Sequence, residues 1–377
     1  MTDTLPTATV GDGTVTEREI SQQPDVWRET GRIVADRRAE LAAFLDPLLA
    51  LPDLRVVLTG AGTSAFVGEV AAPGLSRRLH RRIEAIATTD LVSDPLGRLA
   101  EDVPTLLVSF ARSGNSPESL AATELADQVQ GRVHHLVITC DPEGRLAQQH
   151  RGRERSFVLF TPARANDLGF AMTSSFTSML LSVLLVFLGD DDATVAALAT
   201  AGEQVLSSRD RVQRLVEREP ERIVYLGSGP LTGLSRESAL KMLEITAGRV
   251  DTYFDSALGF RHGPKAVLDD RTLAVVYTSN DPYTRQYDRD ITRELREAIG
   301  QDAVVALQAG ADGDGSDWGL AGIEGIDDAF LALPYVVVAQ LLGLHTSVRD
   351  GVTPDNPFPG GSVNRVVQGV TIHPLEG

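Results

Sequence analysis

Cysteine is almost absent from this chain of 377 residues, because Cys140 is the only one. A disulfide within the chain is therefore excluded, and so is a zinc site built on cysteines. The seven histidines include no pair with the H-x-x-x-H or H-E-x-x-H spacing, at which a helix presents two metal ligands. We expect neither a metal site nor a cofactor.

Positive charge and long hydrophobic runs are also scarce. The chain has 35 Lys and Arg residues against 52 Asp and Glu residues, a formal net charge of −17, and such a field repels nucleic acid. The longest apolar run, residues 179–188, is about half as long as the ~20 residues that span a membrane. The N-terminus lacks the charged and apolar regions of a signal peptide. We expect a cytoplasmic protein without nucleic-acid or membrane partners.

What the chain does have is one recurring local pattern. A short β-branched run ends in a turn rich in glycine or serine and leads into helical periodicity. Alternation of strands and helices predicts parallel sheets with helices on both faces. The four clearest strands are residues 55–59, 105–110, 133–139 and 222–227.

The pattern occurs twice along the chain. Three pairs of strand positions have the same separation, 227 − 60 = 167 residues: Gly60 with Gly227, Thr105 with Thr272, and Leu136 with Ala303. A constant separation predicts a duplicated, doubly wound α/β domain, and a single long sheet is the alternative. The predicted divisions are a loose N-terminal segment 1–26, a first domain 27–192, a second domain 193–350 and a C-terminal tail 351–377.

Two turns in the first half carry hydroxyl groups where ligands of parallel sheets bind, beyond the carboxyl ends of the strands. Thr63 and Ser64 follow the glycine-rich turn of the first strand. In the turn 113–118, Ser116 is suited to cap a helix that begins with Pro117. Free N–H groups at a helix start bind phosphate or carboxylate. Ordinary turns and caps are the alternative for each loop singly, whereas the two together favour an anion site.

The second half carries groups suited to proton transfer. Lys241 and Glu244 are three residues apart on one face of a predicted helix. The alternative for this pair is a solvated surface ion pair. His262 follows in a loop between Arg261 and Gly263. Its polar setting argues against a core position, and a loop histidine without a role is the alternative.

Four segments carry a family resemblance: Gly-Ala-Gly-Thr-Ser64, Ser-Phe-Ala-Arg-Ser-Gly-Asn-Ser116, Ala-Leu-Lys241-x-x-Glu244 and Arg-His262-Gly-Pro-Lys265. They resemble the sugar isomerase (SIS) family and look like the isomerase half of glucosamine-6-phosphate synthase. Segments 170–177, 258–265, 279–285 and 355–370 resemble more closely the AgaS-type proteins, which are tagatose-6-phosphate ketose/aldose isomerases or galactosamine-6-phosphate deaminases. The resemblance implies two tandem doubly wound parallel-sheet domains of the flavodoxin-like type, with the tail closing over the active site.

The resemblance also implies which residues hold the substrate. The hydroxyls of Ser64, Ser113 and Ser116 match groups that bind the sugar phosphate in the synthase, and Thr63 lies beside them. The segment that ends at Phe170 matches one that lines the substrate. The substrate class is therefore expected to be a sugar phosphate.

Three further residues match the catalytic groups of the synthase. Glu244 matches the carboxylate that moves a proton between carbons 1 and 2, and Lys241 matches a lysine beside it. His262 matches a histidine that assists ring opening and reaches in from the other subunit. The resemblance thus implies a homodimer whose subunits share the site.

Two positions depart from the synthase pattern. Arg112 stands in place of a residue in the synthase's Ser-Gln-Ser turn, and this turn has one hydroxyl fewer. The guanidinium is expected to replace it with a charge-assisted contact to phosphate. In the tail, Gln368 aligns with the ring-opening lysine of the synthase. Since glutamine is neither acid nor base, ring opening would fall to His262 or water, unless the alignment is one residue off.

These inferences favour an aminosugar-phosphate deaminase/isomerase that converts D-galactosamine 6-phosphate and water to D-tagatose 6-phosphate and ammonia. The synthase's glutaminase half has no counterpart in the sequence, so amination from glutamine is not expected. A neutral ketose/aldose sugar-phosphate isomerase uses the same base and is an alternative. A non-catalytic sugar-phosphate-binding regulator is the alternative from another class, although a regulator would not need Glu244 and His262.

Overall fold

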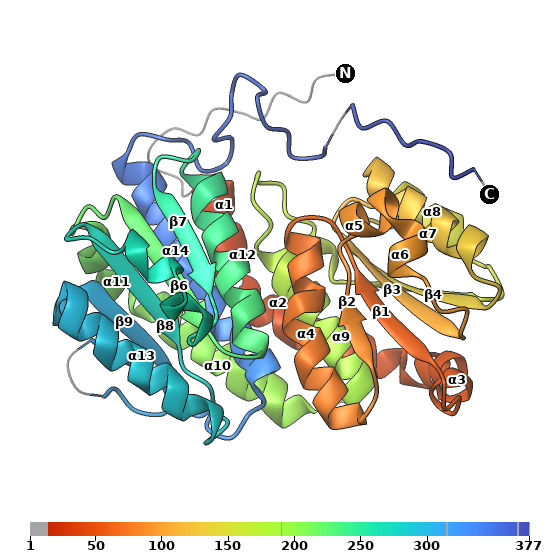
Figure 1. The fold of residues 1–377 in the computed structure, drawn as a ribbon, viewed down its shortest axis with the longest axis horizontal. Helices are drawn as coiled ribbons and strands as arrows, with labels where there is room; N and C mark the ends of the chain where they lie inside the picture. The colour runs from red at the N-terminus through yellow and green to blue at the C-terminus, as the bar shows by residue number, and fades with distance from the viewer. Residues whose placement is uncertain (1–13, 190, 314–315, 368, 377) are drawn as a thin grey trace.

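A computed structural model describes residues 14–189, 191–313, 316–367 and 369–376. Two five-stranded parallel sheets stand at opposite ends of the molecule, with a layer of helices packed between them (Figure 1). This arrangement is the predicted tandem pair of doubly wound α/β units.

The two sheets have the same strand order. In the first, β2-β1-β3-β4-β5, the strands are β1 (Arg55–Thr59), β2 (Ile83–Ala85), β3 (Thr105–Ala111), β4 (Val133–Thr139) and β5 (Ser156–Phe160). In the second, β10-β9-β8-β6-β7, they are β6 (Arg222–Gly227), β7 (Asp251–Asp255), β8 (Thr272–Tyr277), β9 (Val304–Ala309) and β10 (Asp317–Leu320). Read from β7, the second order repeats the first, and both are the flavodoxin-like order. The duplication inferred from the constant separation is confirmed.

Fourteen α-helices occur in the described residues. Those before the first half's last strand are α1 (Val15–Ser21), α2 (Gln23–Asp36), α3 (Arg38–Leu49), α4 (Thr63–Leu79), α5 (Thr88–Ser93), α6 (Pro95–Arg98), α7 (Pro117–Val129) and α8 (Arg145–His150). The later ones are α9 (Ser174–Leu188), α10 (Asp192–Ser207), α11 (Arg209–Val216), α12 (Pro230–Ile245), α13 (Thr284–Ile299) and α14 (Asp328–Arg349). Short 3₁₀ turns cover Ala163–Ala165, Gly259–Arg261, Pro264–Val267 and Gln301–Ala303.

Glycine sets the same turn at the start of each half. Gly62 between β1 and α4 has φ +56°, and Gly229 between β6 and α12 has φ +57°. A side chain at either position would be strained in this left-handed region. The matched turns start α4 and α12 directly at the carboxyl ends of their strands.

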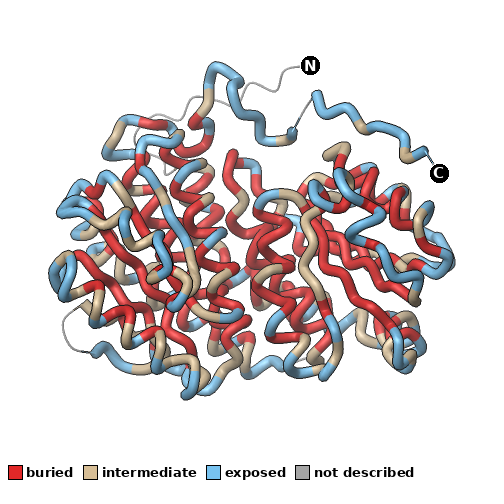
Figure 2. Tube along the Cα trace, viewed as in Figure 1, coloured by how far each residue is buried: buried red, intermediate tan, exposed pale blue. Residues whose placement is uncertain are grey.

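The middle layer of helices forms the common core of both halves (Figure 2). Helix α14 is apolar along most of its length, and 94% of its most hydrophobic 18-residue window is buried inside the protein. A helix that is apolar all round belongs inside a large core or a membrane. Its burial assigns α14 to the core between the sheets.

We expected residues 1–26 to be loose, and this is wrong for the helical residues from 15 onward. Residues 1–13 lie outside the described residues, but α1 and the first turn of α2 cover 15–26. Thr14 caps α1 by accepting the N–H of Glu17, and Ile20 and Val26 are fully buried. The polar composition of the segment hid these core residues. The division of the chain into domains remains our proposal.

Helices α4 and α12 join the two halves and run antiparallel. A Cβ on Gly233 of α12 would lie 2.8 Å from backbone atoms of Glu69 and Val70 in α4. One turn further on, the Arg236 guanidinium lies 4.9 Å from the ring of Phe66 and bonds to Glu69 at 2.6 Å. Later residues of α12 therefore contact earlier residues of α4. The last turns of α12 consequently extend past the start of α4 and beyond the β1–α4 turn.

We expect Gly233→Ala to lower the free energy of unfolding by about 1–3 kcal/mol, because the added methyl group must push the two helix backbones apart. Denaturant unfolding measures this change. Gly31→Ala is the matched control, since a Cβ there meets Val195 at an ordinary 3.5 Å. Alanine also favours a helix interior by up to about 1 kcal/mol, so the control should gain stability. Equal effects of the two changes would contradict the close helix contact.

A buried histidine, His150, makes the stability of the protein depend on pH. His150 is fully buried, with Nδ1 3.0 Å from the Ser156 hydroxyl and its ring centroid 4.6 Å from that of His135. The neighbouring His135 bonds through Nε2 to Asp127 at 2.8 Å. Burial lowers the pKa of His150 from 6.5 to about 3, and the His135 charge acts in the same direction. The folded protein thus holds His150 neutral.

Acid should therefore destabilise the protein in part through His150. Between pH 6.5 and about pH 3 the unfolded chain binds a proton at this residue that the folded chain does not. The stability is complete above pH 6.5 and falls at lower pH by at most about 1.4 kcal/mol per pH unit. In denaturant unfolding at pH 4 to 7, His150→Gln should flatten this slope, whereas exposed His373→Gln should leave it unchanged. A slope identical to wild type in His150→Gln would refute the assignment.

Candidate functional site

A small cavity lies where β1 and β3 end. It has a volume of about 100 Å³ and contains most of the predicted anion-binding groups. Its lining includes Ser64, Arg112, Ser113, Ser116, Ser119 and Met172, and the tail covers it with Arg365, Val366 and Val367. The structure thus brings together four of the predicted site residues from two turns of one sheet edge.

The hydroxyl groups of the second turn are arranged around the start of α7. The Ser116 side chain caps α7 by accepting the N–H of Ser119, and Pro117 takes the first helical position, as predicted. The Ser116 and Ser119 hydroxyls are 2.6 Å apart. The Ser113 hydroxyl accepts the N–H of Asn115 at 3.3 Å. An anion entering here meets several hydroxyls and the positive end of a 13-residue helix.

Arg112 lines this cavity and also holds two neighbouring backbone segments by hydrogen bonds. Its guanidinium donates to the carbonyl of Phe170 at 3.1 Å and to that of Arg365 at 3.0 Å. Burial lowers the pKa of Arg112 to about 10, and the nearby Arg365 charge acts in the same direction. Arg112 therefore stays cationic and ties the loop 167–170 to the tail that covers the cavity.

Phe170 belongs to the loop 167–170, which approaches the cavity from the side of α9. Its ring is mostly buried and lies 5.2 Å from the ring of Phe358. Asp167 holds the loop against α9 by accepting the N–H groups of Thr173, Ser174 and Ser175. The predicted substrate-lining segment is thus anchored between a helix start and the tail.

The end of α12 brings a second set of charges to the same place. Lys241 is fully buried, and its Nζ donates to the carboxylate of Glu244, whose side chain is a quarter exposed. Glu244 raises the pKa of Arg112, and Arg112 lowers that of Lys241. This influence and the antiparallel packing of α12 on α4 put the end of α12 on the side of the cavity, although Glu244 is not among the residues that line it. A solvated surface ion pair is excluded, because the lysine has no exposure.

Glu237 is a member of this cluster that sequence reasoning missed. It is fully buried, and Nζ of Lys241 lies 3.6 Å from Oε1. Burial raises the pKa of Glu237 to about 8, Lys241 opposes this, and Glu244 adds to it. The signal was available: residues four and seven apart lie on one face of a helix, and Glu237 precedes Lys241 by four.

The lysine sits between these two carboxylates. Burial lowers the pKa of Lys241, but the charges of Glu237 and Glu244 outweigh it, so the net shift is upward. A permanently charged ammonium beside an accessible carboxylate can orient that carboxylate or stabilise an oxyanion. The cluster is therefore equipped for proton transfer next to an anion-binding turn.

Besides Phe170, Lys241 and Glu244, two predicted site residues with a described position lie outside the cavity lining. His262 is exposed at the end of a 3₁₀ turn in the second half. Thr63 is the first residue of α4 and is buried near Glu237, whose pKa its hydroxyl lowers. Gln368 lies outside the described residues.

The corresponding sheet edge of the second half is filled by the protein's own carboxylates. Asp288 accepts the Ser228 hydroxyl at 2.6 Å and the Ser279 N–H at 2.9 Å. Asp328 accepts the Asn280 N–H at 2.7 Å and the Ser279 hydroxyl. Within the described residues, no carboxylate takes the amides of the turn 112–116 in this way. In the described part of the chain, the turn of the first half thus lacks the carboxylate acceptors that occupy the turn of the second.

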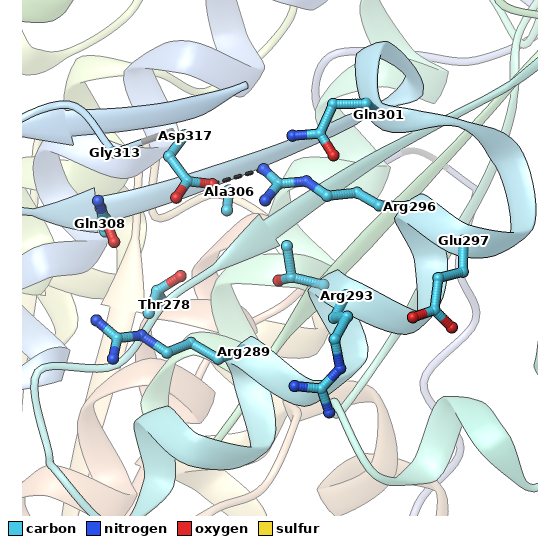
Figure 3. A pocket seen from close by; sticks show the side chains of 11 residues that line it. Thr278, Arg289, Arg293, Arg296, Glu297, Gln301, Ala306, Gln308, Gly313 and Asp317 are labelled. Carbon is cyan, nitrogen blue, oxygen red and sulfur yellow. Dashed lines mark hydrogen bonds and ion pairs between the residues drawn. The ribbon is translucent and has the colours of Figure 1, made fainter. Parts of the chain in front are cut away.

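A larger cavity, of about 650 Å³, lies on the outer side of the second sheet between α13 and strands β8, β9 and β10 (Figure 3). Arg289, Arg293 and Arg296 reach into it from α13. Arg296 bonds to Asp317 on the opposite wall at 2.5 Å, and Arg293 bonds to Asp290. The cavity contains none of the predicted site residues, so its size does not make it the candidate site.

The same arrangement occurs in known proteins. A model of the SIS domain matches residues 49–189. A Streptomyces coelicolor protein named AgaS is 60% identical over all of both chains. The D-galactosamine-6-phosphate deaminase AgaS of a Shewanella species is 44% identical over 96% of this chain and 92% of its own.

A solved structure agrees with these relatives. The tagatose-6-phosphate ketose/aldose isomerase of Escherichia coli superimposes with a TM-score of 0.89 at 41% identity, covering 99% of this chain and all of the other. Sequence and fold are thus shared over the full length of both chains. This protein belongs to the AgaS family of SIS-domain proteins.

Proposed function

We propose that the protein is a D-galactosamine-6-phosphate deaminase/isomerase that forms D-tagatose 6-phosphate and ammonia. Membership in the AgaS family carries the general class, an enzyme that deaminates or isomerises aminosugar phosphates. The observation that carries the site is the packing of α12 on α4, which puts the buried Lys241–Glu244 pair of the second half beyond the turn whose Ser64 lines the cavity of the first. A base at one end of the substrate and an anion cradle at the other is what this reaction needs.

In the proposed reaction the phosphate binds the first half. The hydroxyls of Ser64, Ser113 and Ser116 and the start of α7 hold its oxygens, with Arg112 adding charge. Thr63 and Phe170 shape the neighbouring walls, and Gln368 is kept as a tail residue that contacts the substrate. Binding energy from the phosphate positions carbons 1 and 2 at the base.

Glu244 then moves a proton between these two carbons. In the opened aminosugar the carboxylate takes the proton from carbon 2, and the electron pair forms the enaminol. Returning the proton to carbon 1 leaves an imine at carbon 2, which water hydrolyses to the ketose and ammonia. Lys241 orients Glu244 and faces the oxygen that gains charge. This chemistry uses only side chains and water.

Two alternatives are kept. A neutral ketose/aldose isomerase would use the same Glu244 and release no ammonia. A sugar-phosphate-binding regulator would use the cavity alone, and the buried Lys241 between two carboxylates disfavours it. Burying such charges is costly, and simple binding does not require them.

We also propose a cytoplasmic homodimer in which His262 completes the partner's site and assists ring opening. His262 is exposed, and apolar side chains close to it in the chain are exposed too: Tyr253 and Phe254 on the edge strand β7, and Leu258. An exposed apolar edge strand favours pairing with another chain. A second copy seated there would cover these side chains.

Glu244→Gln should lower kcat for ammonia release from galactosamine 6-phosphate by about 10²–10⁴-fold, because an amide cannot accept the proton. KM should change little, since the phosphate contacts remain. Coupled assays of ammonia and of tagatose 6-phosphate measure the rate, with glucosamine 6-phosphate as the competing substrate. Glu40→Gln, an exposed change in α3, is the control. Wild-type rates in the Glu244 variant would show that the base is misassigned, and ketose without ammonia would favour the neutral isomerase.

The shared site predicts complementation between two inactive variants. In heterodimers of Glu244→Gln with His262→Ala, one of the two sites has both an intact Glu244 and an intact His262. Up to about half of the wild-type activity should then return, since one site per dimer is complete. Co-expression with two different affinity tags isolates the heterodimer. Purified heterodimers without any recovered activity would contradict a site shared between subunits.

A further inference from the structure

The loop 167–170 is held by groups from both ends of the described chain. On one side, Glu19 of α1 accepts the N–H groups of Leu168 and Gly169. On the other side, Arg365 of the tail donates to the carbonyls of Asp167 and Gly169. Two N–H groups and two carbonyls of this short backbone segment thus bond to charged side chains.

The two ends of the chain are also tied to each other at this loop. Asp355 of the tail accepts the backbone N–H groups of Val15 and Thr16 at 2.9 and 2.8 Å, and the Thr16 hydroxyl at 2.7 Å. The carbonyl of Asp355 accepts the N–H of Phe170 at 3.2 Å. Helix α1, the loop and the tail therefore form one hydrogen-bonded unit beside the cavity.

Glu19 is the central group of this unit. It is 7% exposed, and a Cβ on Gly169 would lie 2.9 Å from its Oε2, so the backbone of the loop passes directly over the carboxylate. The charged groups that act on it are Asp167 of the loop and Arg365 of the tail, and Asp355 lies nearby on Thr16. Burial and Asp167 raise the pKa of Glu19 to about 7, while the two loop amides and Arg365 oppose the rise.

We propose that Glu19 is a positioning residue for the active site: with Arg365 and Asp355 it clasps the loop 167–170 in the position in which the loop's carbonyls hold Arg112 in the lining of the sugar-phosphate cavity. The proposal rests on the proposed function only in taking that cavity as the substrate site. Glu19 acts through the loop on Phe170 and Arg112 and does not itself line the cavity. It gives the N-terminal helix, which contributes no group to the cavity lining, a part in substrate binding.

The chemistry of the clasp distinguishes a carboxylate from its closest replacement. Glutamine has nearly the same size as glutamate, but one of its two terminal groups is an NH₂ donor. Two backbone N–H groups of the loop converge on the Glu19 carboxylate, and Gly169 N–H lies 3.3 and 3.2 Å from its two oxygens. An amide there replaces one charged acceptor of this N–H group with an NH₂ donor. Losing one charge-assisted hydrogen bond lowers the equilibrium constant for the clasped position of the loop by roughly tenfold.

The first test is kinetic, on purified full-length protein with galactosamine 6-phosphate. We expect Glu19→Gln to raise KM about tenfold with kcat within about twofold of wild type, and Glu19→Asp to recover part of the loss. Glu17→Gln is the matched control on the same helix, because Glu17 pairs with Arg209 and faces away from the loop. It should behave as wild type. Unchanged KM in Glu19→Gln, or equal changes in the two variants, overturns the proposal.

The pH profile separates positioning from general damage. The substrate phosphate titrates near pH 6 in every variant, so only the difference between profiles reports Glu19. In wild type, Glu19 loses its charge as the pH falls through about 7, and KM should rise more steeply than in Glu19→Gln, which has nothing to titrate. Parallel profiles would mean that the charge of Glu19 is irrelevant to substrate binding.

Amide hydrogen exchange tests the clasp without any reaction. Peptides covering residues 167–173 should exchange faster in Glu19→Gln than in wild type or Glu17→Gln, because the Leu168 and Gly169 amides lose a charged acceptor. Arg365→Met, which removes the opposite side of the clasp, should do the same and offers a second variant if Glu19→Gln folds poorly. Unchanged exchange in both overturns the clasp. An inactive wild type with faster exchange in the variants would instead refute only the proposed function.

Discussion

A fully buried lysine held between two carboxylates is the interaction on which the rest of the site depends. Removing an ammonium from water costs several kcal/mol in a protein interior, and Lys241 recovers this cost only if Glu237 and Glu244 stay beside it. All three lie on the last turns of α12. Their placement near Arg112 follows from the antiparallel packing of α12 on α4, which Gly233 permits by letting the backbones meet. One helix contact thus places a base from one half beside an anion cradle in the other.

Much of the architecture could be predicted from local sequence. Buried parallel strands leave continuous β-branched runs, and duplication keeps their spacing. One separation of 167 residues, shared by three pairs of strand positions, therefore predicted a duplicated α/β domain. The cap at Ser116 was also predictable, because it depends on neighbours within four residues. Such features are encoded within one turn or one strand.

Features that depend on tertiary contacts could not be predicted in the same way. Whether Lys241 and Glu244 form a surface pair or a buried one is decided by α4 and α14 packing over them, and a helical spacing alone fits both. The helix from residue 15 was missed because its polar side chains find partners hundreds of residues away, such as Asp355. For the same reason Arg112 was expected only at the phosphate, whereas most of its described hydrogen bonds go to loop and tail carbonyls.

The two halves differ in which charged side chains occupy the corresponding turn. In the second half, Asp288 and Asp328 occupy the amides and hydroxyls of the turn around Ser279, and burial raises the pKa of both carboxylates. These carboxylates occupy the donors and repel an external anion there. In the first half, no carboxylate of the described residues accepts the amides of the turn 112–116, and Arg112 stands there instead. One copy of the duplicated fold thereby supplies the anion site and the other supplies the base. The overall charge of −17 does not prevent phosphate binding, because the donors next to the phosphate determine its affinity.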